Sequence, residues 1–176
     1  MDNNIIPSTN NIITILGVDP SDTNLGISIL EYDIENKIAT CLDASTLRAA
    51  SKNVLASFDV LAQGFKEYID EWQPQIMSIE LPIFTGRYAA MGSTCLHMVG
   101  ILRLIAYKKK LAEFGYSPKT VKLKVTGSGN AGKSDIVRKL KTIYPEQKFT
   151  TKDDHRADAC AIALCYLINT HEHTLS

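Results

Sequence analysis

The feature that most constrains the fold of this chain is a run of apolar, mostly β-branched residues at positions 12–18, which ends at Asp19 and Pro20. A strand buried on both faces accommodates such a run, so we predict a central strand inside a layered α/β domain. Two further strand patterns, at residues 26–32 and 38–42, follow after short polar links. The front of the chain therefore predicts an antiparallel meander of three strands.

Helical and strand patterns alternate through the rest of the chain. Apolar residues recur at helical spacing over residues 51–72, and Pro74 ends that helix. The elements predicted after it are a strand at 76–79, a helix at 88–114, a fifth strand at 121–125, and helices at 134–144 and 155–169. This order predicts a three-layer α/β/α domain around a mixed five-stranded sheet.

The length and composition predict one globular domain. The 176 residues, 45% hydrophobic and 22% charged, can bury a substantial core, and we expect the domain to span residues 12–170. Residues 1–11 are predicted to form a disordered tail, and residues 171–176 a C-terminal tail. No apolar run approaches the roughly 20 residues of a membrane span, and the polar start is unlike a signal peptide. We therefore expect a cytoplasmic protein without a membrane partner.

The four cysteines of the chain predict no metal site. They stand in apolar stretches without CxxC spacing, at Cys41, Cys95, Cys160 and Cys165. Such residues are typical of a reduced protein core.

A formal net charge of zero hides a segregated distribution of charge. Residues 103–141 hold eleven lysines and arginines against Glu113 and Asp135, a net charge of +9, which leaves −9 for the rest of the chain. Such a basic block can contact phosphates however neutral the whole protein is. The same block can equally form solvated helix faces, so the charge alone leaves both interpretations open.

A set of carboxylates and one histidine indicates a divalent-metal site. Asp19 and Glu80 each end a predicted strand, and both carboxylates emerge at one edge if those strands are neighbours. His155 and Asp158 share a face of the last predicted helix, with Asp154 beside them. Mg²⁺ prefers oxygen ligands, an imidazole makes Mn²⁺ more acceptable, and paired metals can support phosphodiester hydrolysis. Taken singly, Asp19 could form a turn and Asp154 a helix cap.

Residues 127–134, GSGNAGKS, match the phosphate-binding loop motif GxxxxGK[ST] letter for letter. A predicted strand precedes them and a predicted helix follows, which is the context of a nucleotide hydrolase. Only about 40 residues remain after Ser134, too few for the remaining strands and second acidic motif of such an enzyme. We therefore expect no nucleotide cofactor, and expect Lys133 to contact a backbone phosphate of DNA instead.

Four segments, in order and spacing, resemble the signature regions of the RuvC-type Holliday junction resolvases, whose fold is ribonuclease H-like. They read ILGVDPSDTNLGISIL, IMSIEL, VKLKVTGSGNAGKSDIV and HRADACAIAL. The resemblance runs from residue 12 to residue 166 and implies an endonuclease that cuts four-way and other branched DNA with Mg²⁺ or Mn²⁺. It also implies a homodimer, for which residues 98–107 form either the dimer helix or plain core. The source implied is a bacterium or a bacteriophage, so the compartment is the bacterial or host cytoplasm.

The resemblance also implies roles for the metal-binding residues. Asp19 and Glu80 match the first two catalytic carboxylates of the family, and Asp158 matches the last aspartate of its DxxD pair. His155 falls where many members carry the first aspartate of that pair, which lowers the charge of the site by one. Asp154 either compensates for this or only caps the helix. The alternative function is thus a non-catalytic binder of branched DNA with a degenerate site.

The residues expected to contact DNA lie in two places. Lys122 and Lys133 match two family lysines close to the scissile phosphate, and Lys133 is expected to act in catalysis. Family members commonly place an aromatic residue three positions after the second carboxylate, where this chain has Ile83, with Phe84 one later. Phe84 either enters the junction or packs on its own core. The full set of expected DNA-binding residues is Phe84, Arg87, Lys119, Lys122, Lys124 and Lys133.

Overall fold

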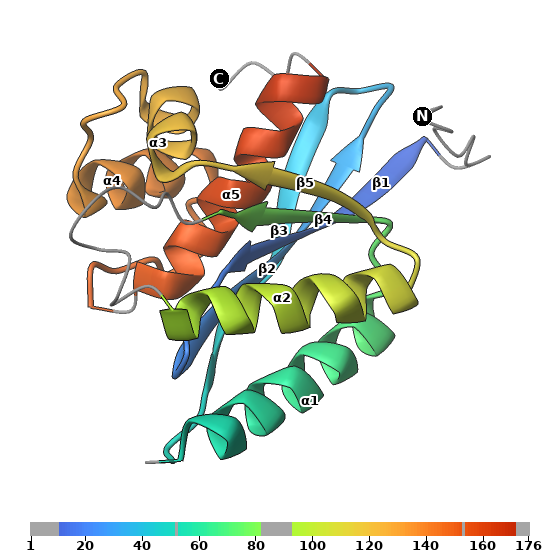
Figure 1. Cartoon of the computed structure of the whole chain (residues 1–176). Coiled ribbons are helices and arrows are strands. Elements are labelled where there is room, and N and C mark those ends of the chain that lie inside the picture. The colour runs from blue at the N-terminus through green and yellow to red at the C-terminus, as the bar shows by residue number, and fades with distance from the viewer. Residues whose placement is uncertain (1–10, 52, 82–92, 153, 172–176) are drawn as a thin grey trace.

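The computed structural model describes residues 11–51, 53–81, 93–152 and 154–171 of the chain (Figure 1). These residues form five strands and five helices, in the order β1 (Ile12–Asp19), β2 (Asn24–Asp33), β3 (Ile38–Arg48), α1 (Val54–Trp72), β4 (Ile76–Glu80), α2 (Ser93–Lys108), β5 (Ala112–Tyr116), α3 (Pro118–Thr126), α4 (Lys133–Ile143) and α5 (Asp154–Thr170). The predicted elements agree with this order except between residues 88 and 126.

The strands form one mixed five-stranded sheet in the order β3-β2-β1-β4-β5. β1, β2 and β3 are joined as an antiparallel meander, while β4 runs parallel to both β1 and β5. The predicted sheet is therefore confirmed, with β1 at its centre. Because β1 and β4 are parallel neighbours, their carboxyl ends lie at the same edge (Figure 1).

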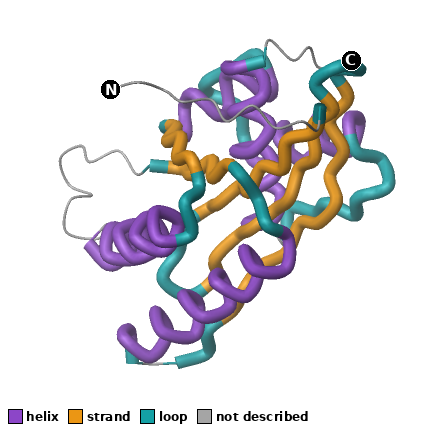
Figure 2. Tube along the Cα trace, turned by 90° about the vertical axis from the view of Figure 1, so that its right-hand side faces the viewer, coloured by secondary structure: helices purple, strands orange, loops and turns teal. Residues whose placement is uncertain are grey.

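Helices cover both faces of the sheet, which confirms the three-layer α/β/α architecture (Figure 2). Successive residues of β1 point to opposite faces: Ile15 belongs to the core under α5, and Leu16 to the core under α1 and α2. Both side chains are fully buried. The unbroken apolar run of β1 is thus the expected pattern of a strand covered on both sides.

Helix α5 lies so close to the sheet that two positions beneath it can carry no side chain. A Cβ atom built on Gly17 would lie 2.1 Å from the carbonyl oxygen of Ala159, and one built on Gly26 would lie 2.1 Å from that of His155. The hydroxyl of Ser78, on β4, donates a hydrogen bond to the carbonyl oxygen of Ile162 at 2.7 Å. Small residues on the sheet therefore set how near the start of α5 comes to the ends of the strands.

The predicted fifth strand was wrong in position, because residues 121–125 belong to α3. The hydroxyl of Ser117 accepts a hydrogen bond from the backbone N–H of Thr120, and Gly127 ends the helix at a φ of 81°. Val121 and Val125 are buried four residues apart on the helix. The letters VKLKV satisfy a strand period and this helical spacing alike, so the pattern could not distinguish them.

The observed β5 begins inside the long helix that was predicted for residues 88–114 and extends two residues beyond it, while α2 ends at Lys108. Gly115 was predicted to stop that helix, but it pairs with Ile79 in the sheet. A Cβ atom on Gly115 would lie 2.3 Å from Cδ1 of Leu81, so this glycine makes room for a neighbouring side chain. The helix prediction failed because the apolar pattern continues across the short turn before β5.

The predicted chain termini are described only in part. Asn11, which was assigned to the N-terminal tail, accepts a hydrogen bond through its backbone carbonyl from the backbone N–H of Ile34 at 2.7 Å. The tails at 1–10 and 172–176 lie outside the described residues. Within the described ranges, no helix is both long and apolar enough to cross a membrane.

All four cysteines are free thiols, as predicted. Cys41, Cys160 and Cys165 are buried, and Cys95 is half-buried. The prediction of a reduced core is therefore confirmed for three of them.

The contact between α5 and Gly17 generates a stability prediction. We expect Gly17→Ala to lower the free energy of unfolding by about 3 kcal/mol, because the added methyl group overlaps the backbone of the helix. Gly100→Ala is the matched control, since nothing lies within 4 Å of a Cβ atom at that position of α2. We expect it to leave stability unchanged or to raise it by up to about 1 kcal/mol. Urea unfolding compares the three proteins, and equal midpoints would contradict the close packing of α5.

Candidate active site

The first two predicted carboxylates lie side by side at one edge of the sheet. Asp19 is the last residue of β1, and Glu80 is the last residue of β4. Val18 pairs with Ile79 in the parallel register, so Asp19 and Glu80 come next at the same level. The condition under which both carboxylates emerge at one edge, that their strands are neighbours, is therefore met.

The first turns of α5 bring His155 and Asp158 to the same edge. Nδ1 of His155 donates a hydrogen bond to Oδ2 of Asp19 at 2.7 Å. The side chain of His155 is 32% exposed and that of Asp19 is 16% exposed, so the pair is partly shielded from solvent. Because this bond takes the proton on Nδ1, the lone pair of the neutral ring lies on Nε2.

Electrostatic effects on Glu80 show which charged groups surround it. Burial, and then the charges of Asp19 and Asp158, raise the pKa of Glu80 to about 7, while Lys122 and Lys133 lower it in part. A carboxyl group between two other carboxylates resists ionisation because like charges repel. The structure therefore brings three predicted metal ligands and two predicted lysines into one electrostatic cluster.

The donor chemistry of this cluster fits a divalent cation. Carboxylate oxygens and an imidazole nitrogen are ligands that Mg²⁺ and Mn²⁺ accept, and a cation would relieve the repulsion that raises the pKa of Glu80. Within the described part of the chain, however, no three His, Cys, Asp or Glu side chains already form a ligand cage. The hydrogen bond between His155 and Asp19 occupies one atom of each. The side chain of Asp154 is outside the described set.

The other two predicted lysines, Lys119 and Lys124, have other neighbours. Lys124 acts on Cys165, whose pKa burial raises to about 12 and Lys124 lowers in part. Lys119 is exposed, and its side chain lies beside Gly129 in the loop after α3. Of the basic block, the structure therefore brings Lys122 and Lys133 to Glu80, but not Lys119 or Lys124.

The loop at residues 127–132 does not have the structure of a nucleotide-binding loop. Helix α3 precedes it, so the strand–loop–helix context assumed from the sequence was wrong. Its amides are bonded internally: the N–H of Asn130 donates to the hydroxyl of Ser128 at 3.3 Å, and that of Gly132 donates to Oδ2 of Asp135 at 2.9 Å. A phosphate would need these donors and the N-terminus of α4, where the carboxylate of Asp135 already lies.

Sequence reasoning missed the part that α2 plays at this edge. The hydroxyl of Thr94 donates to Oδ2 of Asp22 at 3.2 Å, and the thiol of Cys95 donates to the carbonyl oxygen of Pro20 at 3.5 Å. These contacts fasten the loop after β1, which begins next to Asp19. Burial and the nearby charge of Asp19 raise the pKa of Cys95, which lies beside the cluster. No motif marked these residues, because ordinary side chains at a helix start carry no sequence signature.

Two predicted DNA-binding residues lie outside the described part of the chain. Phe84 and Arg87 fall in residues 82–92, as does Ile83 in the family's aromatic position. Their roles at the junction stay predictions.

The raised pKa of Glu80 generates a prediction for the metal-free protein. Between pH 4.5, the ordinary pKa of a glutamate side chain, and about pH 7, the folded protein holds the Glu80 proton more tightly than the unfolded chain does. That stabilisation is lost as the pH rises through 7. With a chelator present, we expect the free energy of unfolding of Glu80→Gln to rise by about 2 kcal/mol relative to that of the wild type between pH 5 and pH 8. Partial exposure of the side chain keeps this difference below the value that the whole pKa shift would give.

Urea unfolding across this pH range measures the difference. Glu71→Gln, on the exposed side of α1, is the control and should follow the wild type at every pH. A constant difference between wild type and Glu80→Gln would contradict the raised pKa.

Comparison with known proteins gives the family. The family model described as Crossover junction endodeoxyribonuclease RuvC matches residues 15–166. The RuvC protein of Finegoldia magna is 32% identical over 157 residues, which cover 89% of this chain and 93% of that protein. The RuvC protein of Endomicrobium trichonymphae is 32% identical over 159 residues, covering 89% and 80% respectively.

Solved structures show the same fold. A structure of Thermus thermophilus RuvC in complex with Holliday junction substrate aligns with a TM-score of 0.79 and 20% identity, over 91% of this chain and 96% of that one. The sequence matches extend over nearly all of the described domain and include the segments that carry the carboxylate cluster. The chain therefore belongs to the RuvC family of crossover junction endodeoxyribonucleases.

Proposed function

We propose that this protein resolves four-way DNA junctions, and acts on other branched DNA, by hydrolysing phosphodiester bonds at the carboxylate cluster. The observation that supports this most is the mutual influence of Asp19, Glu80 and Asp158 at one edge of the sheet, with two lysines beside them. Relatives of this chain carry the name crossover junction endodeoxyribonuclease, and one solved homologue holds a Holliday junction. Because its proposed substrate is DNA, we place the protein in the cytoplasm of a bacterium or of a phage-infected host.

Nucleases of the RuvC family depend in general on divalent metal. In this chain we propose that Asp19, Glu80, Asp158 and His155 hold Mg²⁺, for which Mn²⁺ can substitute, and that Asp154 supplies a further carboxylate. When bound, such cations activate water and stabilise the leaving oxygen of a phosphodiester. Three of these four ligands are carboxylates, and a bound cation would offset their negative charge where a negatively charged substrate has to approach.

The protein's own residues orient the ligands and balance charge. The hydrogen bond from His155 to Asp19 holds both side chains at the sheet edge and fixes the tautomer of the imidazole. Lys133 and Lys122 lie near enough to Glu80 to affect its ionisation. From these positions, the two lysines can also counter the charge that develops on a phosphate during cleavage. Lys119, Lys124, Phe84 and Arg87 complete the proposed contacts with DNA.

Asp19→Asn tests the site directly. We expect it to reduce single-turnover cleavage of a synthetic four-way junction in Mg²⁺ by at least about 10³-fold, because it removes a charged ligand. Junction binding should stay within about threefold of the wild type, since the shape of the side chain is kept. Asp59→Asn, an exposed change of the same kind on α1, is the control and should cut normally. Cleavage retained by Asp19→Asn would show that the active site is elsewhere.

The second candidate function is a non-catalytic binder of branched DNA. The observation that favours it is that His155 stands where many family members have an aspartate and is bonded to Asp19. Wild-type protein assayed on the same junction in Mg²⁺ and then in Mn²⁺ separates the two functions. Binding without cutting in either metal would support the binder.

Lys133→Ala tests the role of the lysine that the phosphate-loop motif contains. We expect the cleavage rate to fall about 10²-fold, because the variant loses one positive charge that stabilises the transition state. Lys133→Arg should restore most of the rate, because it keeps the charge. Neither the wild type nor the variant should hydrolyse ATP. Measurable ATP hydrolysis by the wild type would revive the nucleotide hydrolase interpretation.

We further propose that the protein works as a homodimer. Two-fold symmetry would present two active sites to two strands of a branch. The inner side of α2, including Met98 and Leu102, is buried in the domain's own core, whereas Leu104 is 54% and Tyr107 is 81% exposed. These outer residues of α2 suit a contact with a second copy. Sedimentation velocity without DNA tests this assembly, and a monomer mass at micromolar concentration would contradict it.

A further inference from the structure

The inward-facing side of α2 begins with two polar residues. Met98 and Leu102 are fully buried in the core that α1 and α2 form with the sheet, and Thr94 lies one turn before Met98 on the same side. Cys95 precedes the buried Val99 in the same way. A helix that only packed on a core would carry apolar side chains at these two positions, where α2 carries a hydroxyl and a thiol.

These two side chains hold the loop that follows β1. The hydroxyl of Thr94 donates to Oδ2 of Asp22 at 3.2 Å, and the thiol of Cys95 donates to the carbonyl oxygen of Pro20 at 3.5 Å. Further along, the carbonyl oxygen of Thr23 accepts a hydrogen bond at 2.9 Å from the backbone N–H of the residue that follows β3. The loop is therefore tied to α2 at its start and in its middle, and to the neighbouring strand at its end.

The same turn of α2 lies beside the carboxylate cluster. Burial raises the pKa of the Cys95 thiol, and the carboxylates of Asp19 and Glu80 are among the charges that raise it further. Figure 1 shows that α2 begins at the end of the sheet toward which β4 points. Asp19 comes directly before the loop, so its backbone is held on one side by the sheet and on the other by the contacts with α2.

A fixed ligand binds a cation better than a free one, because less conformational freedom is lost when the cation binds. His155 holds the carboxylate of Asp19 from the side of α5. We propose that Thr94 is a positioning residue for Asp19: through Asp22 it holds the loop, and with it the strand end that carries the metal-binding carboxylate. The inference rests on the proposed function, in which Asp19 is a metal ligand.

Thr94→Val tests this role, because it keeps the shape of the side chain and removes the hydroxyl. The quantity to measure is the Mg²⁺ concentration that gives half of the maximal single-turnover rate on a four-way junction, with protein in excess over DNA. We expect Thr94→Val to raise this concentration about tenfold, while excess Mg²⁺ recovers most of the rate. Thr94→Ser keeps the donor and should stay within about twofold of the wild type. An unchanged Mg²⁺ dependence in Thr94→Val would overturn the proposal.

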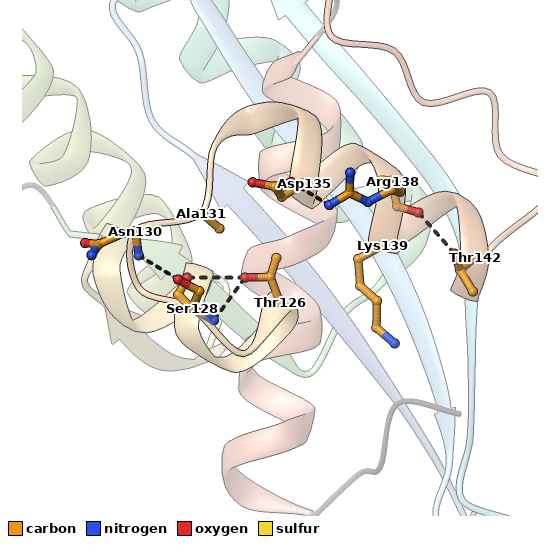
Figure 3. A pocket seen from close by; sticks show the side chains of 8 residues that line it. All are labelled: Thr126, Ser128, Asn130, Ala131, Asp135, Arg138, Lys139 and Thr142. Carbon is orange, nitrogen blue, oxygen red and sulfur yellow. Dashed lines mark hydrogen bonds and ion pairs between the residues drawn. The ribbon is translucent and has the colours of Figure 1, made fainter.

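Thr142→Val is the matched control, since it removes a hydroxyl of another helix. The hydroxyl of Thr142, on α4, donates to the carbonyl oxygen of Arg138 in the same helix at 3.2 Å (Figure 3). We expect this variant to show the Mg²⁺ dependence of the wild type. A change as large as that of Thr94→Val would mean that any lost helix hydroxyl has this effect, which would also overturn the proposal.

Asp22→Ala removes the acceptor from the other side of the bond. In that background, Thr94→Val should change the half-saturating Mg²⁺ concentration by less than about twofold, because the hydroxyl has already lost its partner. Both proteins in this comparison lack the charge of Asp22, so its own effect on the cation cancels. Additive effects of the two substitutions would show that Thr94 does not act through Asp22.

Alkylation of Cys95 by iodoacetamide, with a chelator and without DNA, reports on the loop independently of cleavage. Cys95 is half-buried and the other three thiols are buried, so Cys95 should react first in the folded protein. We expect Thr94→Val to raise the labelling rate at least about threefold, since a released loop uncovers the thiol, and Thr94→Ser to keep the wild-type rate.

The two assays separate failure of this inference from failure of the proposed function. A wild type that never cuts would contradict the nuclease function, whatever the labelling shows. A wild type that cuts, together with a Thr94→Val variant unchanged in both labelling and Mg²⁺ dependence, would contradict only the positioning role.

Discussion

The active site depends on how closely the backbone of α5 packs on the sheet. The carbonyl oxygens of Ala159 and His155 occupy the space that side chains at Gly17 and Gly26 would need. That contact brings the first turns of the helix level with the ends of β1 and β4, where His155 reaches Asp19. A methyl group at either glycine would overlap the backbone of α5, so these glycines permit the close approach of the helix. The packing of the core and the assembly of the site are therefore one constraint.

Groups of opposite charge lie side by side at this edge of the sheet. Carboxylates gather where the strands end, and their repulsion is visible in the raised pKa of Glu80. Lysines from α3 and α4 border them, whereas Asp135 is neutralised by the loop amide of Gly132 and by Arg138. Attraction for cations thus arises at the ends of β1 and β4 and at the start of α5, whereas attraction for phosphates arises at lysines of α3 and α4. A chain of zero net charge can provide both because the opposite charges lie on different elements.

Much of this arrangement could be predicted from the sequence, because strong patterns marked it. The apolar run before Asp19 predicted the central strand. Two strand-end carboxylates would share an edge if their strands were neighbours, and the parallel pairing of β1 and β4 meets that condition. The failures arose where one pattern served two structures. VKLKV fits the period of a strand and that of a helix. GSGNAGKS has the letters of a phosphate-binding loop, but its backbone amides donate hydrogen bonds to the hydroxyl of Ser128 and the carboxylate of Asp135. The contact of His155 with Asp19 could not be predicted, since no local rule sets a distance across 136 residues.

The order of elements along the chain has a consequence for the cell that makes such a nuclease. Asp19 and Glu80 are synthesised early, but α5 follows every other described element. Until α5 emerges and docks, one face of β1 and β2 is uncovered and the site lacks both His155 and Asp158. An incomplete nascent chain therefore lacks two of the four residues that we propose as metal ligands. Synthesis itself delays the appearance of an enzyme that cuts DNA until the domain is finished.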